Sequence, residues 1–473
     1  MDNQSFREEA HRMVDWMADY MNEVENFPVK SQVQPGTIYH SLPELAPTQG
    51  EEMSAIMQDF NNIIMPGITH WQSPNFFAYF PANSSYPSIL AEMLTATLGA
   101  QCMIWETSPA AAELEERMMN WLKTMIGLPA EWHGVIQDTA SGATLAAILA
   151  ARERVTDFKG NQNGPAALIG LRVYCSTETH SSIEKAVKIA GLGRANLVKI
   201  GVDEHFRMDV TALRLAIERD LANGLKPACV VASLGTTGCT AIDPLAAIAE
   251  LTSEYKIWLH VDAALAGTAL VLPEYQFMIK GIELADSFVF NPHKWMFTNF
   301  DCSAYFVKNK EVLIRTFEIL PEYLKTGTRG KVNDYRDWGV PLGRRFRALK
   351  LWFVIRTFGI KSIQQKVREH IRLANWVKHE IIADHRFELM AEVTLNLVCF
   401  RLHPKGIDDI AYLNHLNESL MNRLNATGKI YLTHTKLNGA FTLRMVIAQT
   451  YVQERHVLAA WELIKTMTDE ITI

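Results

Sequence analysis

Between residues 166 and 306 the sequence alternates short, continuous apolar runs with segments of helical periodicity. Runs of about four to eight apolar residues without polar alternation are typical of strands that are buried on both faces. Such strands, separated by helices, form a mainly parallel sheet that helices cover on both sides. The sequence therefore predicts an α/β fold, with strands at residues 168–175, 197–200, 228–233, 258–261 and 288–290.

The composition excludes several classes of protein. With 48% hydrophobic and 21% charged residues, a chain of 473 residues can bury a large core and is not disordered. A net charge of -6 gives no reason to expect nucleic-acid binding, and no apolar run approaches the ~18 residues that span a bilayer. The six cysteines include no CxxC pair, and the start of the chain is polar and acidic. We therefore expect a cytoplasmic protein without disulfides and without a metal, membrane or nucleic-acid partner.

The two ends of the chain are organised differently from the α/β part. Apolar residues at helical spacing over residues 6–24 precede a Pro- and Gly-rich connector, which favours an arm that packs on another body. A partner subunit is one candidate for that body. A long predicted helix ends at residue 358. After residue 360, helical segments alternate with short apolar runs, which predicts a smaller α+β domain. Its predicted helices are residues 363–382 and 408–425, and its predicted strands are residues 387–390, 397–402, 430–432 and 441–447. We expect a helical arm over residues 1–85, a large domain over 86–362 and a small domain over 363–473.

Residues 70–81 contain five aromatic residues and two prolines, a composition that does not fit a regular helix. Two interpretations stay open for this segment. It is either an extended stretch that packs into the core or a rigid apolar wall of a ligand pocket. A second apolar patch, residues 102–106, lies in a predicted loop between two helices.

Four chemically distinct side chains follow the ends of predicted strands. In parallel sheets ligands bind beyond the carboxyl ends of the strands, so these side chains should converge at one edge. A small-residue turn at residues 138–144 opens a helix, whose free N–H groups would suit an anion, although simple N-capping by Ser or Thr also explains the turn. The four side chains are His180, Thr237, Asp262 and Lys294.

These groups together match the needs of pyridoxal phosphate. Taken alone, Lys294 is more readily a surface lysine, but beside the other groups it can hold the aldehyde as a Schiff base. The helix start would hold the phosphate, Asp262 would keep the pyridine nitrogen protonated, and His180 would stack on the ring. The fifteen histidines show no metal-ligand spacing such as HExxH, and neither GxGxxG nor a P-loop motif is present.

Six segments of the chain resemble, in the same order, the group II pyridoxal-phosphate decarboxylases, and in particular the aromatic-L-amino-acid decarboxylases. The resemblance implies the type I fold of pyridoxal-phosphate enzymes and a homodimer with active sites at the subunit interface. It also implies decarboxylation of an aromatic L-amino acid to an arylalkylamine and CO2. The segments are residues 73–80 (SPNFFAYF), 139–144 (TASGAT), 179–182 (THSS), 260–267 (HVDAALAG), 291–295 (NPHKW) and 334–346 (DYRDWGVPLGRRF).

The resemblance also implies a role for individual residues. Lys294 would be the Schiff-base lysine, Asp262 the partner of the pyridine nitrogen and His180 the residue stacked on the ring. Thr237 would lie near the cofactor, and the phosphate would be held by Ala140, Ser141, Asn291 and His293. The substrate pocket would be lined by His180, Trp71, Tyr79, Phe80, Pro81 and Ala82, with Met103 and Ile104 from the other subunit.

Two glycines and six charged residues between 323 and 338 predict a mobile, exposed loop that closes over the site. The resemblance makes Tyr335 the lid tyrosine, which protonates the former Cα with help from His180. Related aromatic acetaldehyde synthases usually lack one of these two residues, so their joint presence favours simple decarboxylation, with the synthase as the alternative. Ala82 and Leu265 depart from the family pattern, so the preferred aromatic amino acid stays open.

Overall fold

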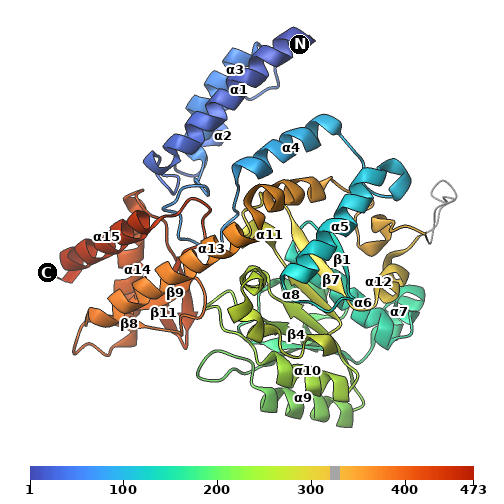
Figure 1. Cartoon of the computed structure of the whole chain (residues 1–473). Helices are drawn as coiled ribbons and strands as arrows, with labels where there is room; N and C mark the ends of the chain where they lie inside the picture. Colours follow the sequence, from blue (N-terminus) through green and yellow to red (C-terminus); the bar gives the residue numbers. More distant parts are fainter. Residues whose placement is uncertain (320–330, 473) are drawn as a thin grey trace. The chain divides into compact units, whose positions relative to one another are not determined.

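The computed structural model describes residues 1–319 and 331–472, and the chain divides into two compact units (Figure 1). The predicted three-part division of the chain stays a prediction. We call the first unit the sheet unit, which comprises Ala82–Arg372 and Ala391–Leu397. We call the second the terminal unit, which comprises Met1–Pro81, Leu373–Met390 and Val398–Ile473.

The sheet unit is built on a seven-stranded sheet in the order β1-β7-β6-β5-β4-β2-β3. The neighbours from β3 to β6 run parallel, whereas β7 is antiparallel to both β6 and β1. This confirms the predicted mainly parallel α/β fold. The strands are β1 (His133–Gln137), β2 (Leu171–Ser176), β3 (Leu197–Ile200), β4 (Lys226–Ser233), β5 (Trp258–Asp262), β6 (Ser287–Phe290) and β7 (Ser303–Val307).

Helices contact the sheet along its length. The helix α6 packs across β4 to β7, while α9 and α10 contact β4 and each other (Figure 1). The long helix α13 is interrupted at Gly359, whose φ of 68° lies outside the helical region. The helices of this unit are α4 (Tyr86–Leu98), α5 (Pro109–Met125), α6 (Ala140–Val155), α7 (Lys159–Asn163), α8 (Ser182–Ile189), α9 (Val210–Ala222), α10 (Leu245–Glu254), α11 (Pro292–Trp295), α12 (Lys310–Phe317) and the first part of α13 (Arg347–Ala383).

Small side chains let α6 lie close to the sheet. Ala143, Ala147 and Ala150 on this helix are fully buried against strand residues such as Val173 and Val289. Because alanine favours the helix and takes little space, the helix axis can approach the strands closely. The start of α6 is thereby placed at the edge of the sheet where β1 ends.

The terminal unit contains the two ends of the chain. Its four-stranded sheet has the order β10-β11-β9-β8, and the pairs β10/β11 and β8/β9 are antiparallel. Of the helices in the described residues, none is long and apolar enough to cross a membrane. The elements are α1 (Asn3–Glu23), α2 (Thr37–Ser41), α3 (Met53–Asp59), β8 (Phe387–Leu389), β9 (Leu397–Leu402), α14 (Ile410–Ala426), β10 (Thr433–Leu437), β11 (Ala440–Val446) and α15 (Glu454–Thr472).

One predicted strand is wrong. Residues 430–432 do not form a strand, and the chain enters β10 only at Thr433. Tyr431 forms only an isolated parallel bridge with Phe76. The side chain of Asn425 binds the next residue, because it accepts the Leu432 N–H (2.9 Å) and donates to the Leu432 carbonyl (3.0 Å). Ile430 and Leu432 are buried, whereas Tyr431 is half-buried and packs edge-on against Phe76.

Candidate cofactor site

Lys294 lies on the single-turn helix α11, four residues after the fully buried strand β6. Its backbone is held on both sides, because its N–H donates to the Asn291 carbonyl (2.9 Å) and its carbonyl accepts from Asn83 Nδ2 (2.6 Å). Burial lowers the pKa of Lys294, and the nearby Asp262 carboxylate opposes this shift. The amine is therefore neutral, and so nucleophilic, at a lower pH than an exposed lysine.

His180 and Asp262 lie within electrostatic reach of Lys294. Asp262 is the last residue of β5, and its carboxylate accepts the Ala264 N–H (3.1 Å). His180 is exposed, yet the protein around the imidazole desolvates it and lowers its pKa; Asp262 opposes this shift and Lys294 adds to it. The structure thus brings together three of the four strand-end residues that the sequence singles out.

The register of the sheet explains this convergence. Ser233 at the end of β4 pairs with Asp262 at the end of β5, which in turn pairs with Val289 of β6. Beyond the strands, the Asn291 N–H donates to the Ala264 carbonyl (3.0 Å), so the chain segments that leave β5 and β6 stay paired. The carboxyl ends of β4, β5 and β6 are therefore level.

Thr237 lies in the loop that follows β4. An isolated antiparallel bridge between Leu234 and Ile242 closes the base of this loop. Within the loop, the Thr240 N–H donates to the Thr236 carbonyl (2.8 Å), and Thr236 Oγ1 accepts the Ala241 N–H (3.1 Å). Thr237 is exposed on this closed loop, directly beyond a strand end.

The start of α6 combines capping with an open helix end. Thr139 is the N-cap residue and accepts the Gly142 N–H (3.2 Å), while the Asp138 carboxylate accepts the Thr139 N–H (2.7 Å). Ala140 and Ser141 are the first helical residues, where N–H groups have no carbonyl partner within the helix. The N-capping interpretation therefore holds, and it leaves an anion site available at the same helix end.

Two further predicted phosphate residues are held by contacts around β6 and β7. Ser303 Oγ donates to Asn291 Oδ1 (2.6 Å), which links the ends of these strands. His293 is buried, and its Nδ1 accepts the Cys302 N–H (2.9 Å). Burial and the Lys294 charge lower the pKa of His293 to about 3. His293 is thus neutral with its proton on Nε2, where it can only donate.

This set of groups fits pyridoxal phosphate. An open helix end and the Nε2–H of His293 suit a phosphate, the lowered pKa of Lys294 suits an aldehyde, and Asp262 suits a protonated pyridine nitrogen. Among the described residues, no group of His, Cys, Asp and Glu is arranged to hold a metal ion.

Sequence reasoning missed Arg336 as a candidate site residue. Its side chain is buried, and within the described residues its Nε and Nη1 have no hydrogen-bond partner. Asp337 lies 3.4 Å from Nε, and the Arg336 N–H donates to the Met103 carbonyl (3.0 Å). A buried guanidinium with unmet N–H groups is costly, so these groups call for a further partner such as an ordered water or an ion. The segment 334–346 includes this residue, but in the sequence its arginine looks like one more charge in a polar stretch.

Tyr335 does not lie in an exposed loop, so that expectation is wrong for residues 335–338. Tyr335 is buried on a short 3-10 helix (Tyr335–Trp338), with the Trp338 ring 5.3 Å and the Arg344 guanidinium 5.1 Å from its ring centre. Burial raises the pKa of Tyr335 well above its usual value. The start of the predicted loop lies outside the described residues. The role of Tyr335 as proton donor stays a prediction.

The aromatic segment contributes both to the core and to a surface of the terminal unit. Phe76, Phe77 and Ala78 are buried, which fits the core-packing interpretation. The rings of Trp71 and Tyr79 stack with their centres 5.8 Å apart. Trp71 is half-buried and Tyr79 is exposed. The Arg444 guanidinium lies 5.5 Å from the ring centre of Phe80, and Pro81 is buried.

The other predicted substrate residues belong to the sheet unit. Ala82 and Met103 are half-buried, whereas Ile104 is buried in its own chain. The prediction that Met103 and Ile104 reach the site of a second subunit stays a prediction.

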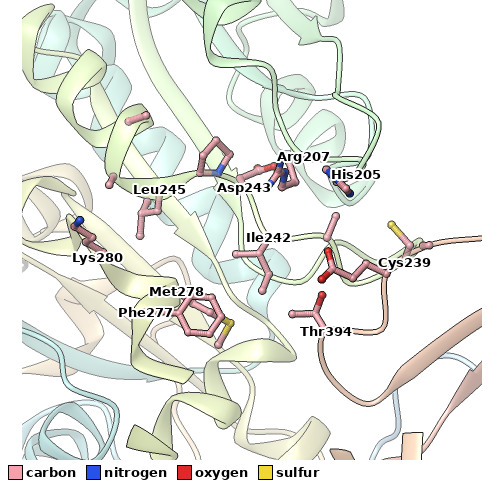
Figure 2. A pocket seen from close by; sticks show the side chains of 16 residues that line it. His205, Arg207, Cys239, Ile242, Asp243, Leu245, Phe277, Met278, Lys280 and Thr394 are labelled. Carbon is pink, nitrogen blue, oxygen red and sulfur yellow. The ribbon is translucent and has the colours of Figure 1, made fainter. Parts of the chain in front are cut away.

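A groove of about 500 Å³ elsewhere in the sheet unit is lined by none of the predicted site residues (Figure 2). His205 and Arg207 lie at one end, and Phe277 and Met278 form an apolar wall. Asp243 stabilises the groove, because its carboxylate accepts the N–H groups of Met208 and Ser233. We therefore place the candidate site at the strand ends and not in this groove.

Comparison with known proteins identifies the class. Residues 35–403 match the family described as the pyridoxal-dependent decarboxylase conserved domain, and the chain belongs to this family. It is therefore a carboxy-lyase that uses pyridoxal phosphate, as the sequence predicts.

Several relatives within the family are named for aromatic amino acids or their products. The chain is 46% identical to the aromatic-L-amino-acid decarboxylase of Sus scrofa, over 100% of this chain and 98% of the relative. It is 42% identical to the phenylacetaldehyde synthase of Arabidopsis thaliana, over 98% of this chain and 96% of the relative. The crystal structure of Catharanthus roseus tryptophan decarboxylase with L-tryptophan superposes with a TM-score of 0.94 at 38% identity, over 100% and 99% of the two chains. The chain thus belongs to the aromatic amino acid decarboxylases and has the type I fold.

Proposed function

We propose that this enzyme removes CO2 from an aromatic L-amino acid and releases the arylalkylamine. The observation that carries the proposal is the convergence of Lys294, Asp262 and His180 at one edge of the sheet. The three residues supply an amine, a carboxylate and an imidazole, and the start of α6 adds an anion site. Relatives that are named decarboxylases of aromatic amino acids support the substrate class.

Each group would have a separate part in the reaction. When bound, pyridoxal phosphate takes up the electron pair that remains as the carboxylate leaves. Asp262 would hold the proton of the pyridine nitrogen, and Lys294 would carry the aldehyde carbon between turnovers. The N–H groups of Ala140 and Ser141, with Asn291 and His293, would hold the phosphate. His180 would lie against the ring face, and Thr237 beside the cofactor.

We propose, as the family resemblance implies, that Trp71 and Tyr79 contact the aromatic ring of the substrate. Trp71 and Tyr79 present stacked rings, and the Tyr79 hydroxyl lies 3.3 Å from that of Tyr431. A substrate ring gains from such a surface through offset or edge contacts, worth about 0.5–1.5 kcal/mol per pair beyond area burial. The pair of tyrosine hydroxyls can also meet a polar atom on the substrate ring. Ala82 has no hydroxyl group, so in this proposal it makes no side-chain hydrogen bond to the substrate ring.

An aromatic acetaldehyde synthase is the second candidate. The 42% identity to the phenylacetaldehyde synthase of Arabidopsis thaliana favours it, as does the buried position of Tyr335. If Tyr335 delivers the proton to Cα, its side chain must leave its buried position beside the Trp338 ring. Without such a proton donor, oxygen can intercept the electron-rich carbon. We favour the amine as product because both His180 and Tyr335 are present.

Product analysis tests the proposal directly. The purified enzyme with pyridoxal phosphate is given tryptophan, phenylalanine, tyrosine or DOPA, and amine, aldehyde, CO2, oxygen uptake and peroxide are measured together. We expect one amine per CO2, with little oxygen uptake, for at least one substrate. The Lys294→Ala variant is the control for background reaction. Aldehyde and peroxide formed in proportion to CO2 would replace the first candidate by the second, and the absence of CO2 would overturn both.

We also propose that the enzyme is a cytoplasmic homodimer whose subunits share their active sites. Helix α1 has no buried residue along its 21 residues, and α4 exposes a stripe of large apolar side chains. Apolar surfaces of this kind are typical of a subunit interface. Free, buried thiols at all six cysteines fit a reducing compartment.

A further inference from the structure

The His180 side chain accepts a hydrogen bond from the start of the helix that follows it. α8 begins at Ser182, two residues after His180, and the imidazole folds back onto that helix start. His180 Nδ1 accepts the Ser182 N–H at 3.1 Å, and the Ser182 hydroxyl oxygen lies 2.8 Å from the same nitrogen. One ring nitrogen therefore meets both the backbone and the side chain of a single residue.

These contacts determine where the ring carries its proton. A nitrogen that accepts an N–H uses its lone pair and cannot carry a hydrogen, so Nδ1 is unprotonated and Nε2 holds the proton. The Ser182 hydroxyl must then donate to Nδ1 as well. The positive end of the α8 dipole further disfavours a proton at this nitrogen.

The charged groups around the ring act in both directions. Lys294 on α11 and Lys185 on α8 lower the pKa of His180, whereas Asp262 at the end of β5 raises it. Desolvation is the largest influence, and it also lowers the pKa. The net effect favours the neutral ring, in agreement with the hydrogen bonds at Nδ1.

We propose that Ser182 is a positioning residue that holds His180 as the neutral Nε2–H tautomer. This inference rests on the proposed function, in which His180 faces the cofactor ring. A neutral imidazole can offer its Nε2–H as a hydrogen bond, but it does not release that proton near neutral pH. His180 is then a fixed ring surface and hydrogen-bond donor, and the proton that reaches Cα comes from another group.

The neighbouring serine provides a matched control. Ser182 is buried and its hydroxyl contacts His180, whereas Ser181 is exposed and makes no side-chain capping hydrogen bond. Ser182→Ala removes the hydroxyl and keeps the backbone N–H, so one of the two donors to Nδ1 is lost. Ser182→Thr keeps a hydroxyl at this position and should restore the wild-type behaviour.

Hydrogen exchange at the imidazole C2 position, followed by mass spectrometry over a pH series, reports the titration of His180 without reference to activity. We expect wild-type His180 to titrate below the usual histidine range. The loss of one hydrogen bond in Ser182→Ala should raise the pKa by about half a unit to one unit. Ser181→Ala and Ser182→Thr should titrate as wild type. An unchanged titration in Ser182→Ala, or a wild-type ring that is protonated at pH 7, would overturn the inference.

Nitrogen chemical shifts give a second readout. In protein labelled with ¹⁵N-histidine, the His180 signals are identified by their loss in His180→Gln. We expect the pattern of an Nε2–H tautomer, and a proton on Nδ1 would contradict the proposal.

In kinetics, the acid limb of the pH profile of kcat/KM should move to higher pH in Ser182→Ala and should stay in place in Ser181→Ala and Ser182→Thr. If the wild type releases no CO2, the proposed function is wrong, but the tautomer measurement still tests the inference about Ser182. If the enzyme is a decarboxylase and the exchange curve of His180 does not move in Ser182→Ala, only this inference is wrong.

Discussion

At the scale of single residues, the surroundings of Lys294 determine its reactivity. Burial lowers its pKa, so the neutral amine forms at a lower pH than in an exposed lysine. Only the neutral amine attacks an aldehyde. We expect the rate at which cofactor-free protein binds pyridoxal phosphate covalently to rise about tenfold per pH unit and to level off below the usual lysine pKa of about 10.4. Rapid-mixing absorbance measures this rate, and borohydride reduction with peptide mass spectrometry locates the bond.

The controls for this prediction are variants of the same lysine. Lys294→Ala and Lys294→Arg should bind pyridoxal phosphate without a covalent bond, since neither can form one. A rate that still climbs tenfold per unit beyond pH 10 would mean that burial leaves the amine unperturbed.

Residues that follow strand ends could be predicted, and residues that support them could not. Asp262 and Lys294 each follow an apolar run, so the parallel-sheet rule brings them together from sequence alone. Ser303 and Asn83 act through the three-dimensional pairing of distant segments, and nothing in their local sequence marks them. Tyr335 was misread for a related reason, because the neighbouring Arg336 and Asp337 suggest solvent although both are buried.

At the scale of elements, the central strands were predictable because their apolar runs are continuous and their ends are marked by turns. The edge of the sheet was harder to predict: β7 runs antiparallel between β1 and β6, a pairing that no periodicity reveals. The Gly359 break in α13 falls between two predicted helices, as expected. The predicted strand at residues 430–432 does not form, since Tyr431 makes only an isolated bridge with Phe76 and Leu432 binds the Asn425 side chain.

Gly267 determines how closely the 3-10 helix Ala266–Val271 can approach β6. A Cβ added there would overlap Phe290 Cβ and lie 2.9 Å from its Cγ. Phe290 is the last residue of β6, one residue before Asn291, so the strand end would have to shift. We expect Gly267→Ala to lower stability by about 1–3 kcal/mol, as overpacking does. It should also reduce the retained cofactor, measured by urea unfolding and by cofactor absorbance after dialysis.

Gly201→Ala is the matched control for Gly267→Ala, because a Cβ added at Gly201 meets no atom within 4 Å. It should unfold and retain cofactor as the wild type does. If Gly267→Ala behaved in the same way, the contact with Phe290 would not position the end of β6.

At the scale of the whole molecule, the exposed apolar surface of α4 indicates how the proposed dimer forms. Leu90, Leu94 and Leu98 recur every four residues and therefore lie on one face of this helix. All three are exposed in the single chain, as are Tyr86 and Met93. A run of large apolar side chains on one face is costly in water, and a two-fold axis would bury the same face on both subunits.

Leu94→Glu tests this face. A carboxylate at the centre of an apolar interface would be desolvated in both subunits, so we expect the variant to be monomeric or to dissociate far more readily. Sedimentation should give twice 53.4 kDa for the wild type and 53.4 kDa for the variant at low concentration. Leu221→Glu on α9 is the matched control, since Leu221 is 43% exposed and Leu94 46%.

Because the proposed active sites are shared, Leu94→Glu should also lose decarboxylase activity as it dissociates, and its specific activity should rise with protein concentration. A wild type that sediments as a monomer, or a Leu94→Glu variant that remains dimeric, would show that α4 is not the interface.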